Sequence, residues 1–234
     1  EIRTGNMGKC VLPHDHETVI GAYHKAGKKE VQMAIETALK AQKQWAEMDW
    51  QDRASIFLKA ADILAGPQRS LLNAASMLSQ SKNVFQAEVD AACEFIDFLR
   101  FNAFYANTIY EQQPPISPTG IWNRLEYRPL EGFIFAATPF NFTSIAGNLP
   151  SAPAMMGNVV LWKPASNATY SAYYVMKLFQ EAGVPDGIIN FIPGAGSEIG
   201  PVVMNSPDLA GVHFTGSTAT FQNMWQAVGS NIKN

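Results

Sequence analysis

The sequence predicts an α/β protein in which a parallel, Rossmann-like sheet has helices on both faces and follows a set of N-terminal helices and an extended arm. Three observations support this. Apolar residues recur at helical spacing through the first hundred residues, a proline-rich segment follows, and the rhythm then becomes strand, turn, helix. They divide the chain into residues 1–111 (helical), 112–131 (arm) and 132–234 (core).

Four helices are predicted in the first segment. The first has one apolar face, formed by Val31, Ile35, Ala38, Leu39 and Trp45. The second begins near Asp52 and stops at Gly66-Pro67, and the third covers residues 71–78. The fourth is long, covers residues 84–110, and repeats Ala91, Phe95, Phe98, Asn102 and Tyr105 on one side. The arm then begins with three prolines and Gly120 and continues as an alternating pattern over residues 121–127.

Strands are predicted at residues 132–137, 158–162, 187–192 and 211–214, with a helix at 170–182. In an open parallel sheet, ligands bind beyond the carboxyl ends of the strands. The turns at that edge are residues 138–143, 163–166, 193–196 and 215–218. Functional residues are therefore expected in these four turns.

Two of the turns have the composition of a phosphate-binding loop. Gly194 and Gly196, and likewise Gly216 and Ser217, permit close backbone approach and leave N–H groups free at a helix start. An isolated glycine pair after a strand is more often only a turn. Gly194, Gly196 and Gly200 do not have the spacing of the dinucleotide fingerprint, so a standard dinucleotide fold is not indicated.

Two polar side chains in the other turns also have two interpretations. Lys163 follows an apolar strand, where its ammonium can donate to ribose hydroxyls or a phosphate, or simply extend into water at the sheet edge. Asn141 lies among apolar residues, where its amide can donate to a developing oxyanion, although a lone Asn is more often a turn former.

Composition narrows the class of partner. The net charge is -3 with 17 dispersed basic residues, which gives no footprint for nucleic acid, and no apolar run reaches the roughly 20 residues of a membrane span. Two cysteines are too few for a disulfide framework or a structural zinc site, so no metal is expected. Both cysteines are interpreted as structural. The expected partner is a small molecule or another protein chain.

Taken together, the four turns resemble strand-end motifs of the aldehyde dehydrogenase superfamily. They stand in the family's order as residues 139–142 (Pro-Phe-Asn-Phe), 162–164 (Trp-Lys-Pro), 193–196 (Pro-Gly-Ala-Gly) and 214–217 (Phe-Thr-Gly-Ser). Residues 57–62, 86–92, 96–102 and 130–133 further resemble the glutamate-semialdehyde (1-pyrroline-5-carboxylate) branch of that family. The resemblance covers essentially the whole chain.

This resemblance implies roles for individual residues. Asn141 would be the catalytic oxyanion donor, Phe142 an aromatic wall around the aldehyde, and Glu94 a carboxylate near the substrate channel. The cofactor, NAD, would be held by Thr138, Pro139, Phe140, Lys163, Ser166, Gly196, Gly216 and Ser217. Ser166 stands where many relatives carry an acidic residue that reads the adenosine ribose, which leaves the preference between NAD and NADP open.

The resemblance also implies oxidation of L-glutamate γ-semialdehyde to L-glutamate in proline catabolism, in the mitochondrial matrix, by a homodimer or higher homo-oligomer formed through the arm. The family's general-base glutamate and nucleophilic cysteine would lie beyond Asn234, and the chain begins at Glu1 rather than Met. We therefore expect a piece truncated before the catalytic domain, inactive alone. A naturally truncated assembly subunit and a dehydrogenase for another semialdehyde are the alternatives.

Overall fold

The computed structural model describes residues 1–231, so the last three residues of the predicted core segment lie outside the described residues. The strands are β1 (Met7–Leu12), β2 (Asp15–His24), β3 (Phe133–Ala137), β4 (Val159–Lys163), β5 (Ile189–Phe191) and β6 (Leu209–Phe214). The helices are α1 (Lys28–Glu47), α2 (Trp50–Ala65), α3 (Arg69–Gln80), α4 (Val84–Ala87), η1 (Glu88–Glu94), α5 (Phe95–Tyr110), α6 (Thr143–Met155), η2 (Ser166–Ala168), α7 (Thr169–Ala182), α8 (Gly196–Met204) and α9 (Thr218–Ser230).

The predicted sheet is confirmed. Its four strands are parallel and stand in the order β5-β4-β3-β6. Every residue of β3 is buried, as are Val159, Val160, Leu161 and Trp162 of β4. Such near-continuous apolar strands are typical of a parallel sheet that is covered on both faces. Because Ala137 pairs with Lys163, the turns after β3 and β4 begin side by side.

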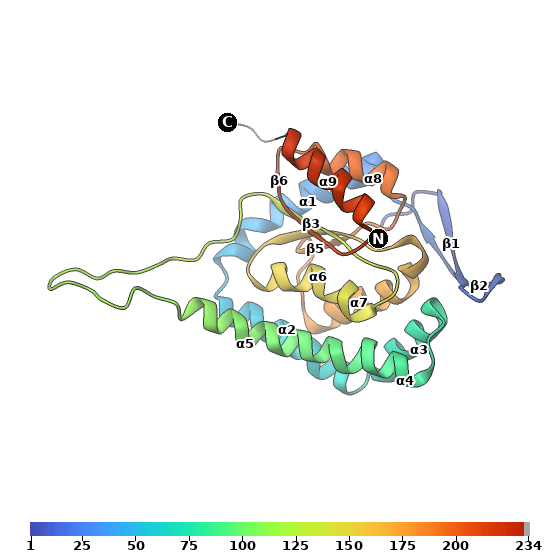
Figure 1. Ribbon diagram of the computed structural model, residues 1–234, viewed down its shortest axis with the longest axis horizontal. Coiled ribbons are helices and arrows are strands. Elements are labelled where there is room, and N and C mark those ends of the chain that lie inside the picture. The colour runs from blue at the N-terminus through green and yellow to red at the C-terminus, as the bar shows by residue number, and fades with distance from the viewer. Residues whose placement is uncertain (232–234) are drawn as a thin grey trace.

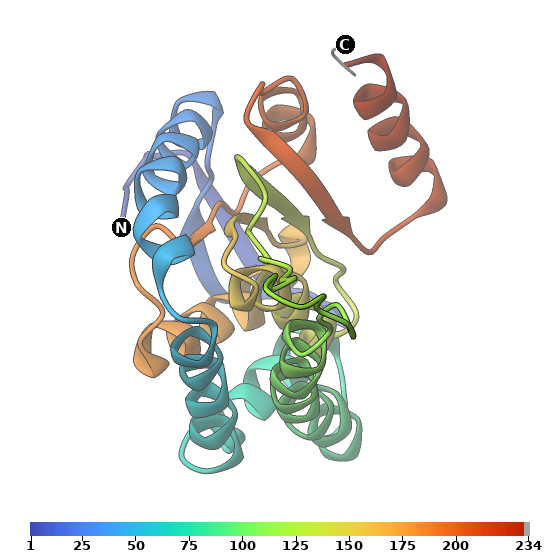
Figure 2. The same ribbon diagram turned by 90° about the vertical axis from the view of Figure 1, so that its left-hand side faces the viewer.

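Helices cover both faces of this sheet, as expected (Figure 1). On one face, α1 packs directly on β3, β4 and β5, and α8 lies beside it. On the other face, α6 contacts all four strands, with α7 next to it. A further layer of α2, α3 and α5 lies beneath α6 and α7 (Figure 2). Helix α6 is therefore packed between the sheet and this outer helical layer.

The first three helices are confirmed, but the predicted inward face of the fourth is partly wrong. The helical run from Val84 to Tyr110 contains the π-helical segment η1. Of the predicted inward positions, Ala91 and Phe95 are buried, but after them the buried residues are Ile96, Leu99, Ala103 and Ala106 rather than Phe98, Asn102 and Tyr105. A π-helical turn accommodates an extra residue, so it shifts every later side chain around the helix axis. The apolar face therefore moves by one residue.

The N-terminal segment is not entirely helical, which corrects the description of residues 1–111. Strands β1 and β2 form an antiparallel hairpin with register shifts at Cys10/Val11 and Val11/Leu12. These irregularities break the alternation that would have predicted strands. The hairpin buries Cys10, and burial raises the pKa of this thiol.

The arm leaves the body as a long excursion between α5 and β3 (Figure 1). Residues 112–130 contain no helix or strand, and most of them are exposed. The two limbs are tied by side chains. The Leu125 N–H donates to Gln113 Oε1 at 2.9 Å, and Tyr127 Oη donates to the Gln112 carbonyl at 2.9 Å. The predicted extended character is confirmed, while strand pairing of the arm stays a prediction.

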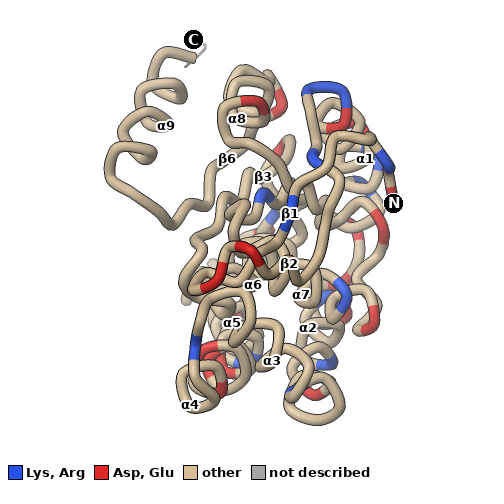
Figure 3. Tube along the Cα trace, turned by 90° about the vertical axis from the view of Figure 1, so that its right-hand side faces the viewer, with Lys and Arg blue, Asp and Glu red and all other residues tan. Residues whose placement is uncertain are grey.

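Charged side chains of both signs are interspersed over the body, whereas the segment of β6 and α9 carries none (Figure 3). Within residues 1–231, no helix is both long and apolar enough to cross a membrane.

Candidate active site

The predicted cofactor residues lie at the carboxyl ends of β3, β4, β5 and β6, as the topology requires. Lys163 and Gly196 come together: a Cβ atom added to Gly196 would lie 3.6 Å from Lys163 Cε. Ser166 Oγ donates to the Gly194 carbonyl at 3.4 Å, which joins the turn after β4 to the turn after β5. The structure thus builds one continuous surface from two turns that are about thirty residues apart in the sequence.

Lys163 has the environment of an anion-binding residue. Burial lowers the pKa of its ammonium. Within the described residues, its Nζ donates only to the neighbouring Pro164 carbonyl, at 3.0 Å. The adjacent start of α8 has Ala195 as its N-cap and no side-chain cap, so the first N–H groups of this helix are available. An anion here would receive both an ammonium and a helix N-terminus.

The three residues directly after β3 differ in their surroundings. Thr138 is buried, and its Oγ1 accepts a hydrogen bond from Trp162 Nε1 at 3.0 Å. Pro139 is also buried, whereas Phe140 is 58% exposed. Thr138 and Pro139 therefore fix the turn, and Phe140 is the side chain that a ligand can reach.

Gly216 and Ser217 lie apart from Lys163, at the end of β6. Ser217 is the N-cap of α9, and its Oγ accepts from the Thr220 N–H at 3.3 Å. Both residues are exposed, and β3 separates their strand, β6, from β4 and the Lys163 turn. Their predicted role in cofactor binding stays a prediction.

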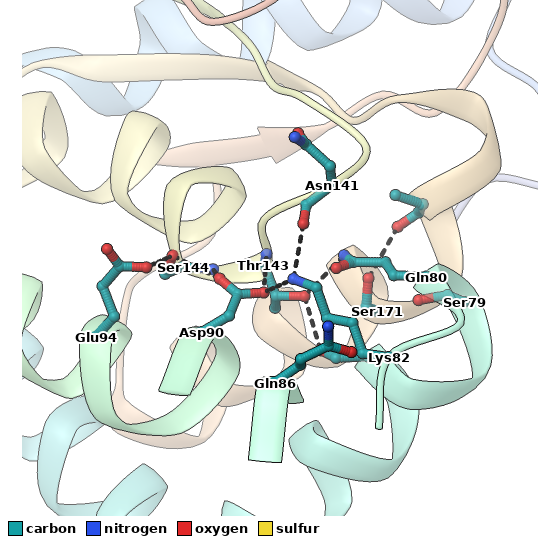
Figure 4. A network of polar contacts seen from close by, with 12 residues as sticks. Ser79, Gln80, Lys82, Gln86, Asp90, Glu94, Asn141, Thr143, Ser144 and Ser171 are labelled. Carbon is teal, nitrogen blue, oxygen red and sulfur yellow. Dashed lines mark hydrogen bonds and ion pairs between the residues drawn. The ribbon is translucent and has the colours of Figure 1, made fainter. Parts of the chain in front are cut away.

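Asn141 and Phe142 lie on the loop that leads into α6, and Phe142 is the N-cap of that helix. Both side chains are exposed. Figure 4 shows the Asn141 carboxamide pointing away from Lys82 and Asp90, while its backbone carbonyl points toward Lys82. The Asn141 carboxamide, which is the predicted oxyanion donor, is thus accessible from solvent, and its main chain faces Lys82.

The groups that hold this loop were not predicted. Lys82 Nζ donates to the Asn141 carbonyl at 2.7 Å and to Asp90 Oδ2 at 2.6 Å, and it lies 4.7 Å from the centre of the Phe142 ring (Figure 4). Asp90 accepts from the N–H groups of Thr143 at 2.8 Å and Ser144 at 3.0 Å. The ion pair therefore contacts both the loop and the first turn of α6.

Asp90 supplies the cap that α6 lacks in its own sequence, because Phe142 has no side-chain oxygen. A carboxylate at a helix N-terminus is stabilised by the helix dipole and by the free N–H groups. Asp90 is only 3% exposed, so these partners replace water as the groups that stabilise its carboxylate. The sequence offered one signal for this role. Asp90 directly precedes Ala91, so an acidic residue borders the apolar face of a predicted helix.

Glu94 joins the same cluster. Its Oε2 accepts from Ser144 Oγ at 2.7 Å, and Asp90 Oδ1 lies 2.6 Å from the same hydroxyl. Both carboxylates come from η1, and π-helical turns are frequent at functional sites. Gly147 of α6 permits this approach, because a Cβ atom there would collide with the Phe95 ring. The structure therefore brings Glu94, Asn141 and Phe142 to one end of α6.

Two shallow apolar grooves lie away from this site. One runs between α2 and α5 against Trp50 and Phe104, and another lies on α9 at Phe221 and Trp225. Neither contains a predicted site residue. Within residues 1–231, no group of three His, Cys, Asp or Glu side chains is arranged to hold a metal ion.

Comparison with known proteins agrees with this geometry. The model of the aldehyde dehydrogenase family matches residues 3–234. The chain belongs to the aldehyde dehydrogenase family. It is 51% identical to a probable delta-1-pyrroline-5-carboxylate dehydrogenase of Schizosaccharomyces pombe over 234 residues, which are 100% of this chain and 43% of that relative. It is 47% identical to the mitochondrial human delta-1-pyrroline-5-carboxylate dehydrogenase, over 99% of this chain and 41% of the human protein.

A solved structure gives the same result. The delta-pyrroline-5-carboxylate dehydrogenase of Mycobacterium tuberculosis, bound with NAD, superimposes with a TM-score of 0.96 and 52% identity over 99% of this chain and 43% of that one. The chain thus corresponds to the N-terminal portion of these aldehyde dehydrogenases and spans less than half of their length.

Proposed function

We propose that this chain is the cofactor-binding portion of an NAD-dependent dehydrogenase that oxidises L-glutamate γ-semialdehyde to L-glutamate in proline catabolism. One observation carries the proposal: the Asn141 loop and the Lys163 turn follow adjacent strands, β3 and β4, at the same sheet edge. An amide donor for an aldehyde oxygen and a cation for a cofactor are thereby placed on neighbouring turns.

The cofactor side of this edge fits a dinucleotide. Lys163 and the uncapped start of α8 suit phosphate or ribose oxygens, and Gly196 leaves room for close backbone approach. NAD is favoured because it is the ligand named for the Mycobacterium tuberculosis and Thermus structures. Bound NAD supplies the hydride acceptor, and the residues of this chain hold and orient it.

On the substrate side, Asn141 donates to the aldehyde oxygen as negative charge develops on it, and Phe142 flanks the carbon chain. Glu94 lies at the same end of α6 and lines the approach. Neither cysteine is placed for the family's nucleophilic role, since Cys10 is buried in the hairpin and the Cys93 Sγ contacts Arg69 and Glu88 rather than the Asn141 loop. We infer that the 234-residue polypeptide alone does not oxidise aldehydes.

Two further properties belong to the same proposal. The arm exposes Ile116, Ile121, Trp122 and Leu125, which supports its pairing with a second copy of the chain. A mitochondrial location is supported by the relatives from human, mouse and Dictyostelium discoideum, which are named mitochondrial.

The proposed substrate is tested with the full-length protein. NADH formation is followed at 340 nm with L-glutamate γ-semialdehyde and with succinate semialdehyde, which is one carbon shorter and lacks the amino group. A kcat/KM ratio of roughly 100 or more in favour of the first is expected, because a site built for a polar group rejects an analogue without it. A preference for succinate semialdehyde would contradict the substrate assignment, and the 234-residue polypeptide serves as the inactive control.

A further inference from the structure

We propose that the Lys82–Asp90 ion pair is a positioning device that sets the direction of the Asn141 carboxamide and the Phe142 ring. The inference rests on the proposed function, because it concerns how the oxyanion donor is aimed. Lys82 and Asp90 would not touch substrate; they would act through the loop that they hold.

Among residues 1–231, the close partners of the Lys82 ammonium all belong to this loop or to Asp90. The ammonium donates one hydrogen bond to the Asn141 carbonyl and another to the Asp90 carboxylate, and it lies over the face of the Phe142 ring. The Lys82 side chain is only 14% exposed, so these interactions are partly shielded from water. Two adjacent predicted site residues are therefore fixed by a single cation.

The hydrogen bond from Lys82 fixes the main chain from which the Asn141 carboxamide extends. Because the Asn141 carbonyl is drawn inward to Lys82, its side chain leaves the backbone on the opposite side (Figure 4). The carboxamide has no other restraint within the described residues. Loss of Lys82 would leave the loop free to rotate, and a misplacement of about 1 Å is enough to cost roughly 100-fold in rate.

The contacts of Asp90 allow the cap of α6 to be tested separately from the hold of Lys82 on Asn141. Its carboxylate keeps two donors on α6 even without Lys82, namely the N–H groups of Thr143 and Ser144. The cap of α6 therefore survives a substitution of Lys82, whereas the hold on Asn141 does not. This distinguishes positioning from a purely structural role.

The test is a double-mutant cycle in the full-length protein with Lys82→Met, Asn141→Ala and the combination. Lys82→Met is expected to lower kcat by roughly 10- to 100-fold, with the Kd for NAD close to its native value. The melting temperature of the folded variant should also fall, because the buried Asp90 carboxylate loses its counter-charge. In the Asn141→Ala background, the same substitution is expected to cost less than about threefold, because its effect passes through Asn141.

Lys177→Met is the matched control. Lys177 also pairs with a carboxylate, Glu1 at 3.4 Å, and lies 5.2 Å from an aromatic ring centre, that of Tyr173, but on α7. It should leave kcat unchanged. If melting shows that Lys82→Met is not folded, Lys82→Gln, which keeps an amide donor without the charge, is measured under the same criteria.

Two outcomes would overturn the inference: a native kcat in the folded Lys82 variant, or a rate loss fully additive with that of Asn141→Ala. In either case a slow Asn141→Ala enzyme would leave the proposed function standing. A native rate for Asn141→Ala itself would instead remove Asn141 from the mechanism, and the positioning inference with it.

Discussion

At the scale of single residues, the position of Lys163 at the end of β4 explains its proposed role in binding the cofactor. It ends β4, where four buried apolar residues precede it, so the strand itself carries the ammonium into a partly buried place. A cation is costly there unless an anion or several acceptors accompany it. Bound NAD would offset that cost.

Lys163→Met is therefore expected to raise the Kd for NAD by roughly 10- to 100-fold, the range for loss of one or two charge-assisted hydrogen bonds. Fluorescence titration of the full-length protein measures it, with Lys43→Met, on the exposed face of α1, as the control. Because burial lowers the pKa of Lys163, native affinity should also decline as pH rises through that lowered pKa, below the ordinary range of lysine. An unchanged Kd would exclude Lys163 from the cofactor site.

Single residues differ in how far the sequence could predict them. Lys163, Asn141 and Gly196 follow strands with strong apolar signals, and topology alone brings such turns to one edge. Lys82 and Asp90 could not be assigned to the site in this way. Lys82 is about sixty residues from Asn141 in the sequence, and the meeting depends on how α3, η1 and α6 pack.

At the scale of elements, the long helix was predicted but its π-helical segment was not. Apolar periodicity reports a helix over a window of many residues, and one extra residue in a turn is invisible until the phase shifts beyond it. The hairpin of β1 and β2 escaped prediction for a related reason, since two register shifts interrupt its alternation. Elements with regular repeats were predictable, and elements with an inserted residue were not.

The arm gives a prediction at this scale. Trp122 is 76% exposed on a segment without backbone pairing, so a second copy is expected to cover it. Trp122→Ala should weaken self-association of the full-length protein by roughly 10- to 100-fold, as for a central aromatic of an interface. Sedimentation equilibrium measures the change, with Phe85→Ala on α4, 77% exposed, as the control. Equal association of Trp122→Ala and native protein would exclude the arm from the interface.

The whole molecule places the two regions of the proposed function, for cofactor and for aldehyde, on adjacent turns of one sheet. The cofactor side is built on β4, β5 and α8, and the aldehyde side is built on the start of α6, which is fixed by η1 and by Lys82. This arrangement implies that part of the chemical step, and not only cofactor binding, belongs to this portion of the enzyme. Asn141 is the residue on which that claim depends.

The most direct test is the single-turnover rate of NADH formation from L-glutamate γ-semialdehyde by the full-length protein carrying Asn141→Ala, measured by stopped flow. The rate is expected to fall by roughly 10²–10³, as for removal of one oxyanion donor, while the Kd for NAD stays near its native value. A native rate, or a rate loss explained entirely by weaker NAD binding, would contradict the account.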